Sequence, residues 1–141
     1  MVPDNVIKRL IDIGNCSLNL DLDESQIKDL KIYDKINRLH WNEWYSIADK
    51  LNVMDLANLI RGLTIAEKIF NWTGGSVSAV IWTFRSLQNR DIELANTLAD
   101  WILKKTNNPW VPFGTQNHGA KSLDEYSSLV KSHNAKINQR L

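Results

Sequence analysis

The amino-acid sequence predicts an all-α fold of six to seven helices. Apolar residues recur at intervals of three and four along most of the chain, which is the spacing of one face of an α-helix. Asp, Asn or Ser precedes several of these segments, where its side chain can cap free backbone amides. The one alternating stretch, residues 15–22, is too short and isolated to form a sheet. We therefore expect a single domain spanning residues 1–141.

The first predicted helix spans residues 4–13. Asp4 is placed to cap it, several apolar residues then share one face, and Gly14 is expected to end it in a left-handed conformation. A second helix begins after Asp23, which has the spacing of a capping box with Gln26.

The second helix would be divided by a break near Tyr33 and Asp34. Its continuation carries a stripe of residues at offsets of three and four, as expected for one helical face. The stripe consists of Ile36, Leu39, His40, Glu43, Trp44, Ile47 and Leu51.

Three further helices are predicted at residues 53–71, 76–89 and 91–105. Asn52 can cap the first of them. Its core face is expected to hold Leu56, Leu59, Ile60, Leu63 and Phe70. The opposite side is expected to hold Arg61, Thr64, Lys68 and Asn71. The links at 72–75 and 89–91 are short, so these three helices should be antiparallel neighbours.

A final helix is predicted after Ser122, which forms the pattern of a capping box with Glu125. Its apolar side would hold Leu123, Tyr126, Leu129, Val130, His133 and Ile137. In shape, the short-linked helical pairs are similar to α-solenoid hairpins of the HEAT type. An irregular bundle fits the same pattern equally well.

The composition is that of a globular protein without strong overall charge. Apolar residues make up 43% of the chain and the net charge is +1. The single cysteine, Cys16, allows no intramolecular disulfide, and no apolar segment is long enough for a membrane span. These features predict a cytoplasmic location without membrane association. The six tryptophans are spread along the sequence, which favours core-filling roles over a single aromatic platform.

The irregular segment 106–121 is the main candidate for function. Sixteen residues without secondary structure are unusual in a compact domain, and such loops are often functional. Pro109 and Pro112 stiffen it and would present Trp110 and Phe113 as side chains for a partner. Alternatively, both aromatic side chains fold back and plug an open end of the core, because an exposed Trp–Phe pair is unfavourable.

Glu67 is the main candidate for a buried charge. It lies three residues before Phe70 on the expected core face, and a buried carboxylate seldom lacks a partner. We expect a structural ion pair with Arg85 in the neighbouring helix, or otherwise with Arg61. Nearby, the turn containing Gly74 and Gly75 lacks the lysine and the strand of a phosphate loop, and is expected to be a plain helix–helix turn.

The remaining polar patterns give little support for catalysis or metal binding. His40 and Glu43 could share a metal from one helical face, but a hydrogen-bonded histidine at the edge of the core is the simpler interpretation. Cys16 has no identifiable base, and no strand precedes a nucleophilic serine. We therefore expect no cofactor and no metal.

Charge is unevenly distributed along the sequence. Residues 1–55 hold ten acidic and seven basic residues, whereas residues 104–141 hold two acidic and six basic ones. The basic residues of the C-terminal part are Lys104, Lys105, Lys121, Lys131, Lys136 and Arg140. They could track a phosphate backbone or form a solvated helix face.

These observations favour a non-catalytic protein that binds another protein through the 106–121 loop. Size and the lack of catalytic patterns make it similar to adaptors, inhibitors or bacterial immunity-type proteins that neutralise a toxin, which is an analogy rather than a motif. Trp110, Phe113 and His118 would form the contact, while Lys104, Lys105 and Lys121 steer an acidic partner. The alternatives are a nucleic-acid-binding protein using the basic C-terminal face, and a small enzyme with a Glu67, Arg85 and His118 cleft.

Overall fold

The computed structural model describes the backbone of residues 1–140 and the side chains of residues 1–135. Its α-helices are α1 (Asp4–Cys16), α2 (Glu24–Ile27), α3 (Trp41–Asp49), α4 (Val53–Phe70), α5 (Ala79–Arg90), α6 (Ile92–Lys105) and α7 (Leu123–Arg140). Three 3₁₀ segments are η1 (Lys28–Arg38), η2 (Gly75–Val77) and η3 (Gly114–Gln116). No strand occurs in the described part of the chain, so the predicted all-α class is confirmed.

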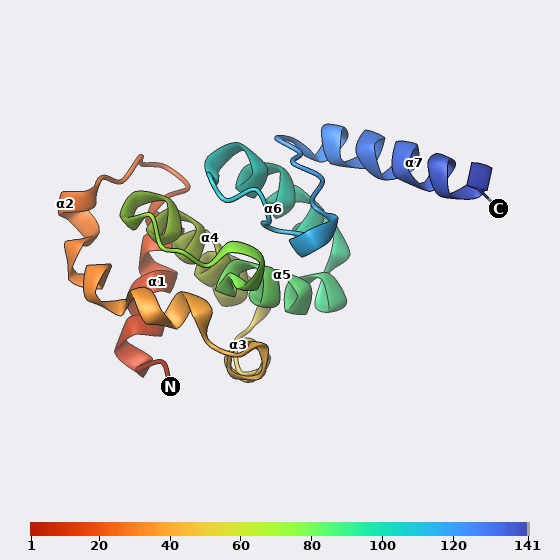
Figure 1. Cartoon of the computed structure of the whole chain (residues 1–141). Helices are drawn as coiled ribbons and strands as arrows, with labels where there is room; N and C mark the ends of the chain where they lie inside the picture. The colour runs from red at the N-terminus through yellow and green to blue at the C-terminus, as the bar shows by residue number, and fades with distance from the viewer. Residues whose placement is uncertain (141) are drawn as a thin grey trace.

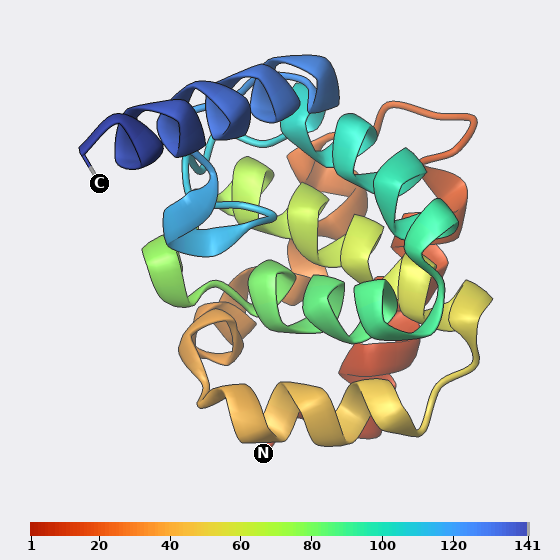
Figure 2. The same cartoon turned by 90° about the vertical axis from the view of Figure 1, so that its right-hand side faces the viewer.

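The helices form a bundle around α4 (Figures 1 and 2). Helices α1, α2, α5 and α6 and the η1 segment all contact α4. Of its expected core face, Leu56, Leu59, Ile60, Leu63 and Glu67 are buried and Phe70 is partly buried. Arg61 and Thr64, which were expected on the opposite side, are buried as well, whereas Lys68 and Asn71 are exposed. The prediction of a polar outer face is therefore wrong at Arg61 and Thr64 and confirmed at Lys68 and Asn71; a helix with neighbours on several sides has little surface left for solvent.

Close contact between α1 and α4 depends on two glycines. A Cβ on Gly14 would overlap the backbone carbonyl of Asn58, and a Cβ on Gly62 would overlap that of Leu10. The prediction that Gly14 ends the first helix is therefore wrong, because Gly14 lies inside α1, which continues to Cys16. The absence of side chains at these positions lets the two helix backbones touch.

In the segment between residues 23 and 49, a helix begins where the sequence predicts, but the predicted continuous helix after Tyr33 is divided into two. Asp23 and Gln26 form the expected capping box, and Tyr33 breaks the helical geometry of η1. The stripe that begins at Ile36 is interrupted at Leu39, and His40 caps a separate helix, α3. Trp44 still reaches the core, where its indole nitrogen donates to the Ile36 carbonyl at 3.0 Å.

Helices α4, α5 and α6 are neighbours, as their short links predict, and successive helices reverse direction (Figure 2). Asn52, Ser78 and Asp91 cap these helices through their side chains. Ser122 caps α7, which packs against α6 near its start and then extends away from the bundle (Figure 1). The predicted placement of Ile137 lies outside the described side chains.

Candidate protein-interaction surface

The 106–121 loop is held in one conformation by its own hydrogen bonds. The side chain of Asn117 donates to the Pro109 carbonyl at 2.9 Å and accepts from the Phe113 amide at 3.3 Å. Asn108 accepts from the Trp110 amide at 2.9 Å, and the Gly114 amide donates to the Trp110 carbonyl at 2.6 Å. A loop fixed in this way loses little conformational entropy when it binds a partner.

The two aromatic residues of the loop occupy different environments. Phe113 packs edge-on against Phe84 of the core and stacks on Tyr126 of α7, with ring centroids 5.5 and 3.8 Å apart. Trp110 remains 41% exposed. Phe113 therefore fits the alternative in which the loop plugs the core, whereas Trp110 is accessible from solvent.

A cluster of polar side chains anchors this loop to the central helix. The buried Glu67 Oε2 accepts hydrogen bonds from the amide groups of Asn37 at 2.8 Å and Asn108 at 3.2 Å. Asn108 also donates to the Gly75 carbonyl at 3.1 Å. A Cβ on Gly74 would overlap Asn37 and approach Glu67 Oε2 within 2.8 Å, so only glycine fits there. The cluster thus joins α4, η1, the 71–78 link and the 106–121 loop.

The burial of Glu67 is confirmed, but its expected ion pair with Arg85 is wrong. Its partners are the two asparagine amides, and no described cation, including Arg61, forms an ion pair with it. Burial raises the pKa of Glu67 above its ordinary value of 4.5 because the charged form loses hydration; the hydrogen bonds it accepts act in the opposite direction. Its other oxygen, Oε1, is buried with no hydrogen-bond partner among the described residues.

Arg85 instead is partly buried beside Trp82 of α5 and the loop. Its guanidinium carbon is 4.9 Å from the centre of the Trp82 ring, which is the geometry of a cation–π contact. A Cβ on Gly114 would lie 3.2 Å from an Arg85 nitrogen, so the arginine sits between Trp82 and the loop backbone. No carboxylate of the described part forms an ion pair with Arg85.

Trp82 is the end of a row of aromatic side chains across α3 and α5. Ring centroids are 4.6 Å apart for His40 and Trp41, 5.6 Å for Trp41 and Tyr45, and 6.3 Å for Tyr45 and Trp82. Trp41 is 43% exposed, and Tyr45 and Trp82 are partly exposed. We call the set His40, Trp41, Tyr45, Trp82 and Arg85 the aromatic row.

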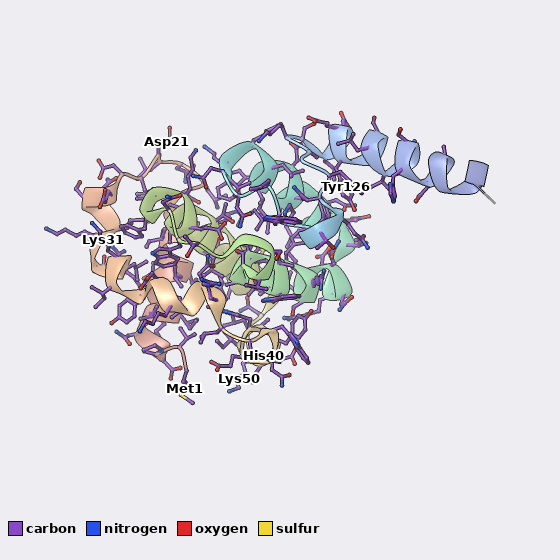
Figure 3. The ribbon with its side chains drawn as sticks, in the orientation of Figure 1. Met1, Asp21, Lys31, His40, Lys50 and Tyr126 are labelled. Atoms are coloured by element: carbon purple, nitrogen blue, oxygen red, sulfur yellow. The ribbon has the colours of Figure 1, made fainter. Side chains whose placement is uncertain are left out.

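Helix geometry explains why the aromatic row forms. Trp41 and Tyr45 are four residues apart on α3, and Trp82 and Arg85 are three apart on α5, so each pair lies on one helical face. Figure 2 shows α3 beside α5, with the 106–121 loop at the N-terminal end of α5, and Figure 3 labels His40 at the start of α3. The row and the loop are therefore adjacent.

The sequence did not reveal this row. The spread of tryptophans suggested core-filling roles, and Trp44 and Trp72 do fill the core, but Trp41 and Trp110 are exposed. The signal that was present is the pair Trp41 and Tyr45 at helical spacing outside the apolar stripe. The link to Trp82 depends on how two helices pack, which local spacing does not contain.

His40 and Glu43 have separate roles. The Nδ1 atom of His40 accepts from the Asn42 amide at 3.2 Å, and Glu43 pairs with the terminal amine of Met1 at 3.5 Å. Among the described residues, no group of three or more His, Cys, Asp or Glu side chains is arranged to hold a metal.

The other predicted contact residues lie at several places around the loop. His118 is exposed and its ring centroid is 5.3 Å from that of His133 on α7. Lys104 pairs with Asp100 at 2.7 Å and Lys105 with Asp21 at 3.5 Å, whereas Lys121 is exposed. The side chains of Lys136 and Arg140 lie outside the described part.

Comparisons with protein-family models, with curated proteins and with solved structures find no match to this chain. Within the described residues, no helix is sufficiently long and apolar to cross a membrane.

Proposed function

We propose that the protein is a non-catalytic module of the adaptor or inhibitor kind that binds another protein through the aromatic row and the adjoining 106–121 loop. The observation that carries this proposal is the partly exposed, contiguous row from His40 to Arg85. Tryptophan, tyrosine and arginine are the residues most enriched among those that dominate protein–protein binding energy. Such side chains remain on the surface of a folded domain at a hydrophobic cost, which a binding partner removes.

Charge suggests the nature of the partner. Arg85 is the cation of the row and forms no ion pair with a described side chain, while the Trp82 ring holds it in place. A carboxylate on the partner could contact Arg85 while apolar side chains cover Trp41 and Tyr45. We therefore propose a protein partner with an acidic group beside an apolar contact, and Trp110 as a second contact at the loop.

The experiment is a quantitative affinity capture from host lysate with immobilised protein. Wild type is compared with the double variant Trp41→Ala/Tyr45→Ala and with Ile32→Ala, a matched control that removes an exposed apolar side chain outside the row. We expect wild type and the control to retain the same protein at high salt, and the double variant to lose it. Circular dichroism checks that all three remain folded.

Two outcomes would overturn the proposal. Equal retention by the double variant would show that the row is not the contact surface. Retention of nucleic acid only at low salt would instead support the alternative that uses the basic C-terminal face, because phosphate contacts weaken steeply with ionic strength. The pairing of Lys104 and Lys105 with aspartates reduces the free positive charge available for that alternative.

A further inference from the structure

A second candidate site lies between α4, α6 and the segment of residues 17–22. It is a cavity of about 350 Å³, which is within the range of small-molecule sites. Its lining combines apolar side chains with charged ones. The lining residues are Ser17, Leu20, Asp21, Leu22, Ile65, Lys68, Trp101 and Lys105.

The walls of the cavity follow from helical spacing. Ile65 and Lys68 are three residues apart on α4, and Trp101 and Lys105 are four apart on α6, so each helix contributes an apolar residue with a lysine beside it. The 17–22 segment closes the third side, and Figure 3 labels Asp21 on it. The cavity therefore combines apolar side chains with two lysine ammonium groups, one from each of two neighbouring helices.

The charges favour an anion. Lys105 is paired with Asp21 at 3.5 Å, but the Asp21 side chain is 98% exposed, so water screens this pair strongly. Lys68 forms no ion pair with a described carboxylate. A carboxylate entering between the two lysines would contact Lys68 and compete with Asp21 for Lys105.

We propose that this cavity binds a small organic anion, with one carboxylate between Lys68 and Lys105 and an apolar, aromatic-sized body against Trp101 and Ile65. A ligand with an anionic group on a hydrocarbon body matches both the lysines and the apolar residues of the lining. This site is separate from the aromatic row, so its ligand does not depend on the proposed protein partner.

The test uses 1-naphthoate as the probe and 1-naphthalenemethanol as its neutral match. Binding is measured by calorimetry and by the indole N–H signals in NMR, with the Trp101 signal identified from Trp101→Phe. We expect naphthoate to bind at one site and to shift the Trp101 signal, and the neutral match to bind at least about five-fold more weakly because it lacks the charge contact.

Three variants sharpen the test. Lys68→Met should weaken naphthoate binding about five-fold, and Lys8→Met, an exposed lysine of α1, should leave it unchanged. Asp21→Asn should strengthen binding, because it removes the competing carboxylate from Lys105. Absence of binding at about 5 mM naphthoate, equal affinity for the neutral match, or no effect of Lys68→Met would each overturn the proposal.

Discussion

Asn108 donates a hydrogen bond of 3.2 Å to the buried Oε2 of Glu67, and this contact fixes the 106–121 loop to the central helix. The same side chain accepts from the Trp110 amide and donates to the Gly75 carbonyl. One asparagine thus positions the exposed Trp110 relative to the 71–78 link and α4. The presentation of the loop therefore depends on a contact that is buried inside the protein.

Replacing Asn108 by alanine should release the loop. The change leaves a buried carboxylate oxygen with one donor fewer, removes one of the two hydrogen bonds to the Gly75 carbonyl and removes the acceptor of the Trp110 amide, so we expect a loss of about 1–3 kcal/mol of unfolding free energy. Chemical denaturation measures the loss, and amide hydrogen exchange should increase most in residues 106–121. Asn107→Ala, at the exposed neighbouring residue, is the matched control. Equal stability of the two variants would contradict the anchoring role.

Replacing Glu67 by glutamine should change how stability depends on pH. Because the folded-state pKa of Glu67 is raised, its stabilising contribution is fully present below the unfolded-state value near 4.5 and is lost as pH rises through the folded-state pKa. Glutamine does not ionise, so the variant should gain stability relative to wild type as pH rises across this window.

The measurement for Glu67→Gln is the unfolding free energy by denaturant titration at a series of pH values. The difference between variant and wild type removes the opposite contributions of Asp29 and Asp100, whose pKa values are lowered by Arg9 and Lys104 respectively. Glu93→Gln, an exposed carboxyl group on α6, serves as the control. A difference that stays constant with pH would contradict a raised pKa.

For Gly62→Ala, helix propensity and the structure predict changes in unfolding free energy of opposite sign. Helix propensity alone predicts a gain of about 1 kcal/mol when alanine replaces glycine inside a helix. The structure predicts a loss of about 1–3 kcal/mol or more, because the new Cβ would overlap the Leu10 carbonyl and force α1 away from α4. Thermal or denaturant unfolding measures the sign, and a stabilised variant would show that the two helices are not in backbone contact.

Phe113→Ala and Trp110→Ala should separate the structural part of the loop from the exposed part. Phe113 packs against Phe84 and Tyr126, so its removal should lower the unfolding free energy by about 3 kcal/mol. Trp110 is 41% exposed, so its removal should have a smaller effect on stability. Denaturant titration compares the two variants, and a larger loss for Trp110→Ala would reverse their assigned roles.

The sequence predicts those features that depend on local spacing. The capping side chains of Asp23 and Asn52 and the break at Tyr33 follow from contacts within a few residues, and the structure confirms them. The burial of Glu67 likewise follows from its place on a helical face. Its partners do not, because Asn37 and Asn108 are 30 and 41 positions away in the sequence.

The aromatic row was beyond prediction for the same reason. Local spacing places Trp41 and Tyr45 on one face of a helix, but it does not specify that α5 packs beside α3. Similarly, local spacing places Arg61 and Thr64 on an outer face of their helix, and only the positions of several neighbouring helices show that they are buried. Pairing across helices is a property of the whole bundle, so residues that depend on it cannot be assigned from one segment.

The polar cluster at Glu67 also has a consequence for the kinetics of folding. Its hydrogen bonds join segments that are far apart along the chain, so they can form only after the loops between those segments have closed. We therefore expect the cluster to be absent from the folding transition state. Substitutions at Asn37 or Asn108 should then accelerate unfolding while leaving the refolding rate nearly unchanged. The cluster therefore slows the unfolding of the native protein rather than speeding its folding.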